Sequence, residues 1–215
     1  MDLGVNDVAR QLAVSEARVR QLIAAGDLPA RQVSGRWLVP EGAVPRSPRV
    51  SRPMSERTSW AFVALLSGQA LAGVAPTERL RLLGKRDQLF ASPQPAVLLR
   101  SWLRRRAGLL RLAAPPGDLP ELLGDARFTP SGISDPRSDM SGGGQAEGYA
   151  RPSDVRALMG DFLMAELVEG NVWLRTTDRP LPRPVPVGLV IADLADHDAP
   201  REDARVEALL GPFSK

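Results

Sequence analysis

Arginine side chains are the groups in this chain whose type and placement best suit a specific chemistry. Of the 28 basic residues only Lys85 and Lys215 are lysines, so the positive charges are almost all guanidinium groups. A guanidinium presents a planar fork of N–H donors that binds a phosphate or a guanine edge through two hydrogen bonds. Because 25 acidic residues leave a net charge of only +3, the position of each arginine matters more than the total.

The segment "SEARVRQLIAAG", residues 15–26, predicts a helix with arginines around its exposed side. Ser15 is a preferred N-cap and Gly26 a preferred C-terminal stop, and the apolar residues between Val19 and Ile23 predict a buried side. The residues left on the outer face are Ala17, Arg20, Gln21 and Ala24, with Arg18 on its flank. A small, polar first turn of this kind suits a helix that approaches base edges in the major groove of DNA.

A β-hairpin is expected directly after this helix, in "RQVSGRWLVP", residues 31–40. Apolar and polar residues alternate on both sides of Ser34 and Gly35, which suit a two-residue turn. Arg31 and Arg36 bracket the turn, where a wing touches phosphates or enters a minor groove. The residues expected to point inward and close a small core are Leu28, Val33, Trp37 and Val39.

A first helix, capped by Asn6 or Asp7, is expected to precede these elements. The order of helix, "LAVSEARVRQLIAAGDLPA" and hairpin resembles the winged helix-turn-helix of the excisionase and MerR-like group of bacterial DNA-binding proteins, over about residues 5–46. This resemblance implies binding of double-stranded DNA. The implied contacts, undivided between bases and phosphates, are Arg10, Ser15, Ala17, Arg18, Arg20, Gln21, Arg31, Ser34 and Arg36. The alternative is a small helical subdomain whose arginines are merely hydrated.

The composition predicts two domains and an α+β fold. Residues 1–46 form the winged helix-turn-helix, residues 47–58 a basic linker rich in proline and serine, and residues 59–215 a larger mixed domain. That domain is expected to begin with amphipathic, arginine-bearing helices and to continue with short strands and helices. The segments "NVWLRTTD" and "VPVGLVIADL" are predicted to be strands, and "PREDARVEALL" a final helix.

One acidic segment, "ADLADHD", contains residue types that could form a catalytic metal site. It places Asp193, Asp196, His197 and Asp198 just beyond an apolar strand, where hydrolases often hold metal ligands, so a metal-dependent enzyme is a minor alternative. Against this stand the single histidine of the chain and the ordinary role of carboxylates ahead of a helix as N-terminal caps. We therefore predict that the protein is not an enzyme, with no catalytic, cofactor-binding or metal-ligating residue and no cofactor.

The compartment expected for this chain is the cytoplasm. There is no cysteine, which excludes disulfides and thiolate metal sites and suits a reducing compartment. The first residues do not have the pattern of a signal peptide, and no apolar run approaches the roughly 18 residues of a membrane helix. A membrane partner is therefore not expected.

The whole layout resembles bacterial antitoxins that accompany nucleotidyltransferase-type toxins of the abortive-infection class. The segments that carry this resemblance are "GYARPSDVRALMGDFLM", "NVWLRTTDRPLP" and "IADLADHDAPREDARVEALL". It implies an autorepressor whose larger domain binds a protein partner, a cognate toxin, and a homo-oligomer is a further expectation. The basic helices between Arg79 and Arg111 and the acidic tail from Asp193 to Glu207 are then available to that partner or to each other. An effector-responsive repressor and an excisionase-like architectural protein that bends DNA remain alternatives.

Overall fold

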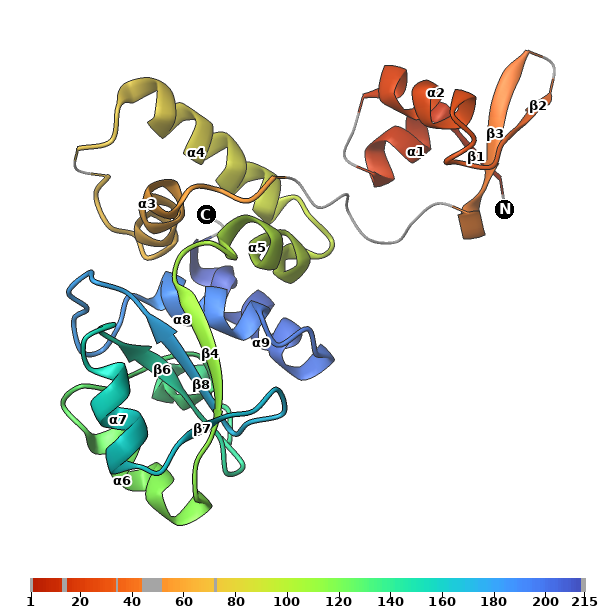
Figure 1. Ribbon diagram of the computed structural model, residues 1–215. Helices are drawn as coiled ribbons and strands as arrows, with labels where there is room; N and C mark the ends of the chain where they lie inside the picture. The colour runs from red at the N-terminus through yellow and green to blue at the C-terminus, as the bar shows by residue number, and fades with distance from the viewer. Residues whose placement is uncertain (1, 13–14, 34, 44–51, 72, 214–215) are drawn as a thin grey trace. The chain divides into compact units, whose positions relative to one another are not determined.

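The chain divides into two compact units, Met1–Ser51 and Arg52–Lys215, in a computed structural model (Figure 1). The structure describes residues 2–12, 15–33, 35–43, 52–71 and 73–213. Ser34, which the sequence predicts in the hairpin turn, lies outside the described residues. We describe the N-terminal unit and the C-terminal unit separately.

The N-terminal unit packs two short helices on a small antiparallel sheet. Its elements are β1 (Asp2–Gly4), α1 (Val5–Gln11), α2 (Glu16–Ala24), β2 (Arg31–Val33), β3 (Arg36–Pro40) and a 3-10 turn, η1 (Glu41–Ala43). The strand order is β1-β3-β2. The side chains that form the core are Val8, Ala9, Leu12, Val19, Leu22, Leu28 and Val39. The helices and hairpin predicted from sequence are therefore present.

Three local expectations for this unit were wrong. The sequence predicted no strand before α1, but β1 pairs with β3, and α1 begins at Val5 after the N-cap Gly4 rather than after Asn6 or Asp7. Val33 is 43% exposed, because β2 is an edge strand whose residues are all exposed. A three-residue strand carries too little alternation to be recognised from sequence alone.

The C-terminal unit begins with a group of helices. These are α3 (Glu56–Leu66), α4 (Pro76–Phe90) and α5 (Pro95–Leu103), and the last helices of the chain, α8 (Val187–Ala195) and α9 (Pro200–Leu210), pack with them in one apolar core. The hydroxyl of Ser55 caps α3, so this helix starts three residues before Ser59, where the second domain was expected to begin. Proline occupies the first turn of α4, α5 and α9, where its missing N–H costs no helical hydrogen bond.

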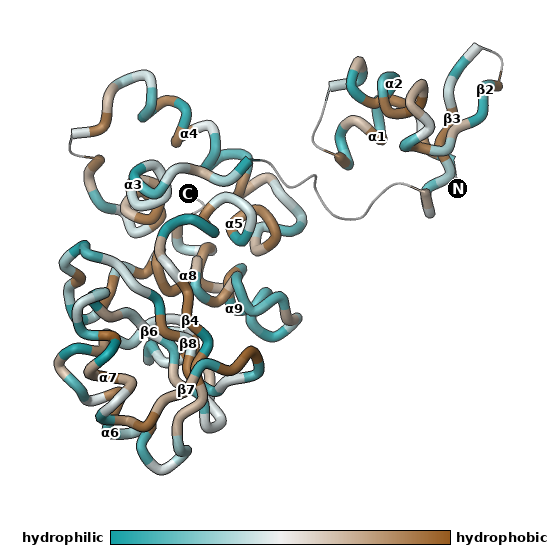
Figure 2. Tube along the Cα trace, viewed as in Figure 1, coloured by the Kyte–Doolittle hydropathy of each residue, from teal (hydrophilic) through white to brown (hydrophobic). Residues whose placement is uncertain are grey.

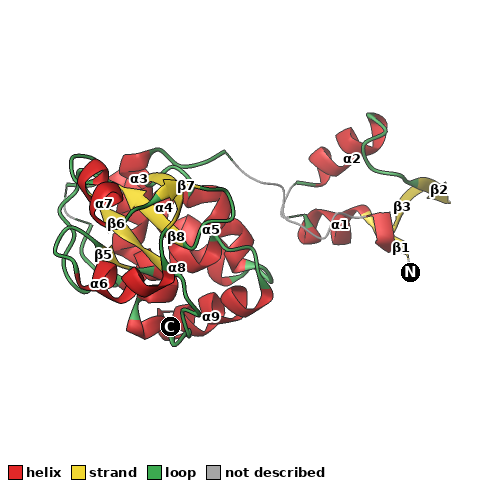
Figure 3. Ribbon diagram, turned by 60° about the horizontal axis from the view of Figure 1, so that its bottom comes forward, coloured by secondary structure: helices red, strands yellow, loops and turns green. Residues whose placement is uncertain are grey.

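A mixed sheet forms the second layer, with strand order β5-β6-β8-β4-β7 (Figure 3). The strands are β4 (Gly108–Ala113), β5 (Thr129–Pro130), β6 (Ala146–Ala150), β7 (Ala165–Glu166) and β8 (Val172–Thr176). β6 and β8 are parallel, and the other pairs are antiparallel. Together with the helices, this sheet makes the protein an α+β chain, as predicted.

The two faces of the sheet differ in chemistry. One face, with Ala146, Val172 and Leu174, packs on α6 (Leu119–Gly124) and α7 (Val155–Asp161) in a second apolar core. Because side chains alternate along a strand, the neighbouring residues of β6 and β8 point to the opposite face, toward α8. Those residues include charged groups, so the layer between sheet and α8 is partly ionic.

The segment "VPVGLVIADL" is a helix, α8, and not the strand that its sequence predicted. Eight consecutive residues, from Gly188 to Ala195, are buried, and Asp193 is the one charged residue among them, so the run shows no exposed polar stripe (Figure 2). Periodicity does not separate a buried helix from a buried strand in so short a run. Gly188 brings α8 against α3, because a Cβ there would lie 2.4 Å from the carbonyl oxygen of Val63.

Of the helices in the described ranges, none has both the length and the apolar character needed to span a membrane.

Candidate nucleic-acid interface

The second helix of the N-terminal unit, α2, has the surface that the sequence predicted for a recognition helix. The Ser15 hydroxyl accepts a hydrogen bond from the Arg18 backbone N–H at 3.3 Å, which fixes the first turn. Val19 and Leu22 are buried against the core, and Gly26 ends the helix with a φ of +77°. The predicted contact residues on the other side, all exposed, are Ala17, Arg18, Arg20 and Gln21.

The arginines of α2 form weak, solvent-exposed contacts with neighbouring side chains. Arg18 donates to the side-chain oxygen of Gln21 at 3.1 Å, and Arg20 forms an ion pair with Glu16 at 2.8 Å. Exposed ion pairs of this kind contribute only about 0–1 kcal/mol, because water and salt screen them. Both guanidinium groups can therefore exchange these partners for a phosphate or a base edge.

The hairpin next to α2 has the form of a wing. Gly35 adopts a φ of +79° in the turn between β2 and β3, and Trp37 pairs with Gln32 across the hairpin. Arg36 is exposed beside the turn, whereas Arg31 pairs with Asp2 at 2.6 Å and so links β2 to the first strand. The remaining predicted contact, Ser34, lies outside the described residues.

The charges of the N-terminal unit are balanced rather than strongly positive. Residues 2–43 contain five arginines and five acidic residues, so their net charge is zero. The ion pairs that cancel part of the positive charge are Arg10–Asp7, Arg20–Glu16 and Arg31–Asp2. Among the residues that the structure describes, Arg18 and Arg36 take part in no such pair. The described guanidinium groups left without an ion-pair partner thus lie in the first turn of α2 and beside the wing turn.

The acidic segment of the C-terminal unit forms ion pairs rather than a metal site. Asp193, at the end of α8, is fully buried and lies 2.5 Å from the Arg106 guanidinium, and Asp198 instead pairs with Arg100 at 2.6 Å. Across the described ranges there is no group of three or more His, Cys, Asp and Glu residues that could hold a metal ion. The basic helices and the acidic tail thus contact each other at these points.

The pair of Asp193 and Arg106 belongs to a larger buried ionic cluster between the sheet and α8. Its members are Arg106, Glu147, Tyr149, Arg175, Asp193 and Asp196. Arg175 is its centre, at 2.5 Å from Glu147, 2.9 Å from Asp196 and 3.3 Å from Asp193. On the open side of the cluster, His197 lies 2.9 Å from Glu147 and stacks on Trp173 at 4.1 Å between ring centroids.

Burial and charge act in opposite directions on the acids of the cluster. Burial raises the pKa of Glu147 and Asp196, but nearby groups outweigh it and hold each pKa below its usual range. These groups are chiefly Arg175 and His197 at Glu147, and Arg106 and Arg175 at Asp196. At Asp193, burial raises the pKa and the arginines Arg175 and Arg106 only reduce that rise. Burial also raises the pKa of Tyr149, so its hydroxyl stays protonated and donates to Asp193 at 2.8 Å.

Most of this cluster was not predicted from the sequence, whose acidic segment contains Asp193 and Asp196 but not Glu147, Tyr149 or Arg175. The available signal was alternation, since the strands "AEGYA" and "VWLRT" carry polar or large residues at every second position between small or apolar ones. Such a pattern predicts one apolar face and one polar face, but it does not show that the polar face is also buried.

Comparison with known proteins identifies only the N-terminal unit. Residues 3–44 match a family model described as a helix-turn-helix domain. No curated protein matches the chain, and no solved structure does. The chain therefore carries a DNA-binding helix-turn-helix domain at its N-terminus, as its sequence predicted, which supports a DNA-binding regulator.

Proposed function

We propose that this protein is a transcriptional repressor of its own operon and an antitoxin, whose C-terminal unit binds a cognate toxin. The observation that carries the DNA-binding half is the exposed first turn of α2, with Arg18 and Gln21 beside a wing that bears Arg36. In helix-turn-helix proteins this helix enters the major groove while neighbouring groups contact phosphates. The exposed Arg36 of the wing adds a second point of contact with the DNA backbone.

The stretch of sequence that follows the hairpin carries additional positive charge. Residues 42–55 contain Arg46, Arg49 and Arg52 and no acidic residue. Because residues 2–43 are electrically neutral, these arginines give the DNA-binding region most of its net positive charge. They therefore favour binding to phosphates without reading the sequence.

The partner-binding half of the proposal draws support from exposed apolar side chains of the C-terminal unit. Leu163, Leu167 and Val168 flank the edge strand β7 and are 74%, 53% and 75% exposed. Apolar residues gathered at a sheet edge are typical of a surface that another protein covers. The resemblance to antitoxins supplies the kind of partner.

The proposal is tested by expressing the full chain with the product of the reading frame next to its own. We expect the two proteins to purify together in a fixed ratio and growth arrest by the neighbour to be relieved. A reporter placed behind the operon's own promoter should be repressed by the full chain. If the neighbour neither binds nor inhibits growth, the antitoxin function is wrong, whereas repression of the reporter tests the regulator function separately.

A second candidate function, an effector-responsive repressor, is favoured by one feature of the structure. A cavity of about 220 Å³ in the C-terminal unit is lined by four arginines. A ligand held there would give a repressor a means of responding to a small molecule. Reporter repression that changes on addition of such a ligand would distinguish this function from that of an antitoxin.

A further inference from the structure

The arginine-lined cavity lies where β5, the end of β6 and the segment after β8 meet. The basic residues that line it are Arg127, Arg151, Arg179 and Arg183. One acidic residue, Asp154, also lines it, and its carboxylate accepts a hydrogen bond from the Ser153 hydroxyl at 3.2 Å. The lining therefore presents four guanidinium groups and one carboxylate, although Arg127 is also paired with two carboxylates behind the wall, those of Asp125 and Asp161.

Two of the four arginines, Arg127 and Arg183, are held by hydrogen bonds and ion pairs within the wall of the cavity. The Arg183 guanidinium donates to the carbonyl oxygens of Asp125 and Ala126 at 2.8 and 3.0 Å, and also to that of Phe128. Arg127 is bound by Asp125 at 2.6 Å and by Asp161 at 2.8 Å. These contacts fix the loop before β5 to the segment after β8, and they leave the remaining two arginines as candidate ligand-binding groups.

Arg151 and Arg179 are those remaining groups. Arg151 follows β6 directly, is exposed and, within the ranges that the structure describes, forms no ion pair. Arg179 is 44% exposed in its side chain, and its nearest carboxylate, Glu56, is 3.7 Å away. Both guanidinium groups therefore retain N–H donors that can turn to an anion in the cavity.

A groove lined mostly by apolar residues, with Arg57 and Gln69 among the polar ones, adjoins this cavity. It has a volume of about 600 Å³ and shares Arg179, Pro180 and Leu181 with the lining of the cavity. Its other walls include Trp60 and Leu71, and the Arg179 guanidinium lies 5.4 Å from the centroid of the Trp60 ring. A ligand that enters both spaces would thus meet donors for an anion at one end and apolar walls at the other.

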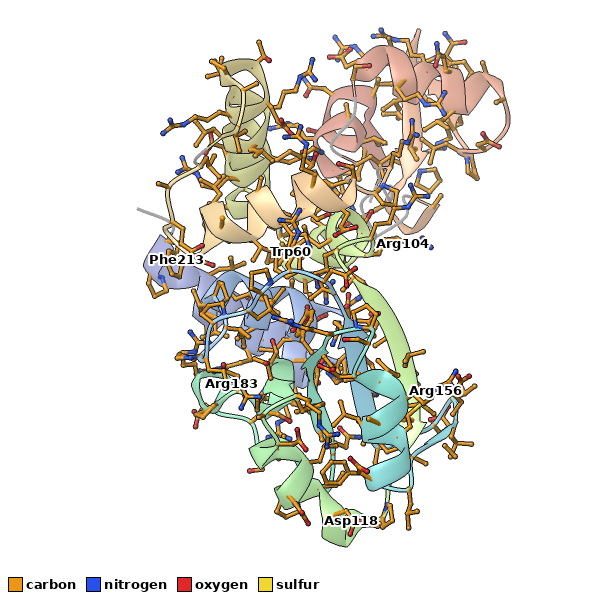
Figure 4. All side chains as sticks on the ribbon, turned by 60° about the vertical axis from the view of Figure 1, so that its left-hand side comes forward. Trp60, Arg104, Asp118, Arg156, Arg183 and Phe213 are labelled. Atoms are coloured by element: carbon orange, nitrogen blue, oxygen red, sulfur yellow. The ribbon has the colours of Figure 1, made fainter. Side chains whose placement is uncertain are left out.

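We propose that the cavity and groove together bind a small phosphorylated molecule, with its phosphate on Arg151 and Arg179 and an apolar or aromatic group against Trp60 and Leu181. A phosphate dianion offers enough acceptor oxygens to engage two guanidinium groups at once, each through paired hydrogen bonds. The apolar walls supply the contact area that an inorganic anion lacks. Figure 4 labels Trp60 and Arg183, which mark these two regions, and shows Arg156 well apart from both.

The test is calorimetric titration of the full chain with three probes: inorganic phosphate, phenyl phosphate and adenosine monophosphate. At least one organic phosphate should bind with one site per chain and at least about tenfold more tightly than inorganic phosphate, a difference of about 1.4 kcal/mol. Arg151→Ala combined with Arg179→Ala should weaken that binding by at least about tenfold. The matched control, Arg156→Ala, removes an exposed arginine of α7 outside the cavity and should leave it unchanged.

Three results would overturn the proposal: no binding of any probe at millimolar concentration, equal binding to the double variant, or no gain from the organic group. A parallel titration with duplex DNA identifies the main alternative source of phosphate. We expect the double variant to bind duplex as the unaltered chain does. If it loses affinity for DNA while the small phosphates do not bind, the cavity is part of a nucleic-acid surface and the proposal is wrong.

Discussion

Arg175 shows how single residues join the layers of the C-terminal unit. It projects from β8 toward α8 and is almost completely buried, with three carboxylates within 3.3 Å. Taking such charges out of water is costly unless each has a partner, and here Glu147, Asp193 and Asp196 share two arginines. The cluster therefore sets how β6, β8 and α8 meet, since a shift of any one of them would leave a buried charge unpaired.

Replacing Arg175 with methionine should destabilise the C-terminal unit by about 3–5 kcal/mol, because it leaves buried carboxylates without a partner. Urea denaturation monitored by tryptophan fluorescence measures this loss. Arg156→Met, at an exposed position of α7, is the control and should change the free energy of unfolding by less than about 0.5 kcal/mol. Equal stability of the two variants would mean that the cluster does not hold the layers together.

The acids of the cluster also predict a dependence of stability on pH. Because the pKa of Glu147 is lower in the folded protein than its ordinary value of 4.5, the folded state binds fewer protons than the unfolded chain. The stabilisation is present above that ordinary value and is lost as the pH falls through the lowered pKa. Asp196 has the same sign, whereas the raised pKa of Asp193 acts in the opposite direction, its stabilisation declining as the pH rises through the raised value.

We therefore expect the unaltered protein to lose more stability between about pH 5 and pH 3 than Glu147→Gln does. Asp196→Asn, a less buried site, should reduce the same loss if the first variant proves too unstable to measure. The measurement is the free energy of unfolding in urea at each pH. Parallel pH profiles for the unaltered protein and both variants would show that these carboxylates do not carry the dependence.

At this scale the sequence predicted which residues of α2 are exposed, but not what they contact. Spacing of three and four residues placed Val19 and Leu22 inside and Arg18 and Gln21 outside. The pairs that tie Arg31 to Asp2 and Arg175 to Glu147 join segments 29 and 28 positions apart. Such partners depend on how the strands align, which one-dimensional spacing does not contain.

Among the elements, α8 is central to the C-terminal unit, because it packs both on the helices and on the sheet. The prediction that its segment is a strand was wrong. The role of Gly188 is clear only when "VPVGLVIADL" is a helix. In the helix this residue allows close packing on α3, where its backbone N–H donates to the Ser67 hydroxyl at 2.9 Å, and that hydroxyl donates to the Val63 carbonyl at 2.7 Å. The contact requires a residue without a side chain.

Gly188→Ala should destabilise the C-terminal unit by about 1–3 kcal/mol, since the added methyl group overlaps the α3 backbone. Gly160→Ala is the matched control in α7, where nothing lies within 4 Å of the added Cβ. It should be neutral or stabilise by up to about 1 kcal/mol through better helix propensity. Thermal denaturation of both variants decides the point: equal shifts would contradict the close packing of α8 on α3.

Elements with an apolar stripe along one face, or with capping residues at their ends, could be predicted from the sequence. Elements without either feature could not. α2 has its cap and stop residues, and α9 has Pro200 in its first turn and an apolar stripe. β1 and β7 have three and two residues, too few for a pattern, and they exist because β3 and β4 offer edges for pairing. Tertiary contacts, not local sequence, decide such elements.

As a whole molecule, the protein joins a small DNA-binding unit to a larger unit with its own core. The sequence placed the boundary of the winged helix-turn-helix near residue 46, and the contacts divide the chain after Ser51. Composition alone could locate that change, because the prolines and arginines of residues 45–53 interrupt the apolar patterns on either side. The arginine-lined cavity could not be predicted, since its four arginines come from separate stretches between residues 127 and 183.

The most direct test of the central claim, that α2 presents its arginines to duplex DNA, is a fluorescence anisotropy titration. The full chain is titrated with duplex from upstream of its own reading frame, at low and at moderate salt. The affinity should fall as salt rises, because arginines release counterions from the phosphates, and Arg18→Ala with Arg20→Ala should weaken binding by at least about tenfold. Arg156→Ala with Arg201→Ala removes the same charge from exposed sites of the C-terminal unit and should leave binding unchanged. If the α2 variant binds as tightly as the unaltered chain, α2 is not the helix that reads DNA.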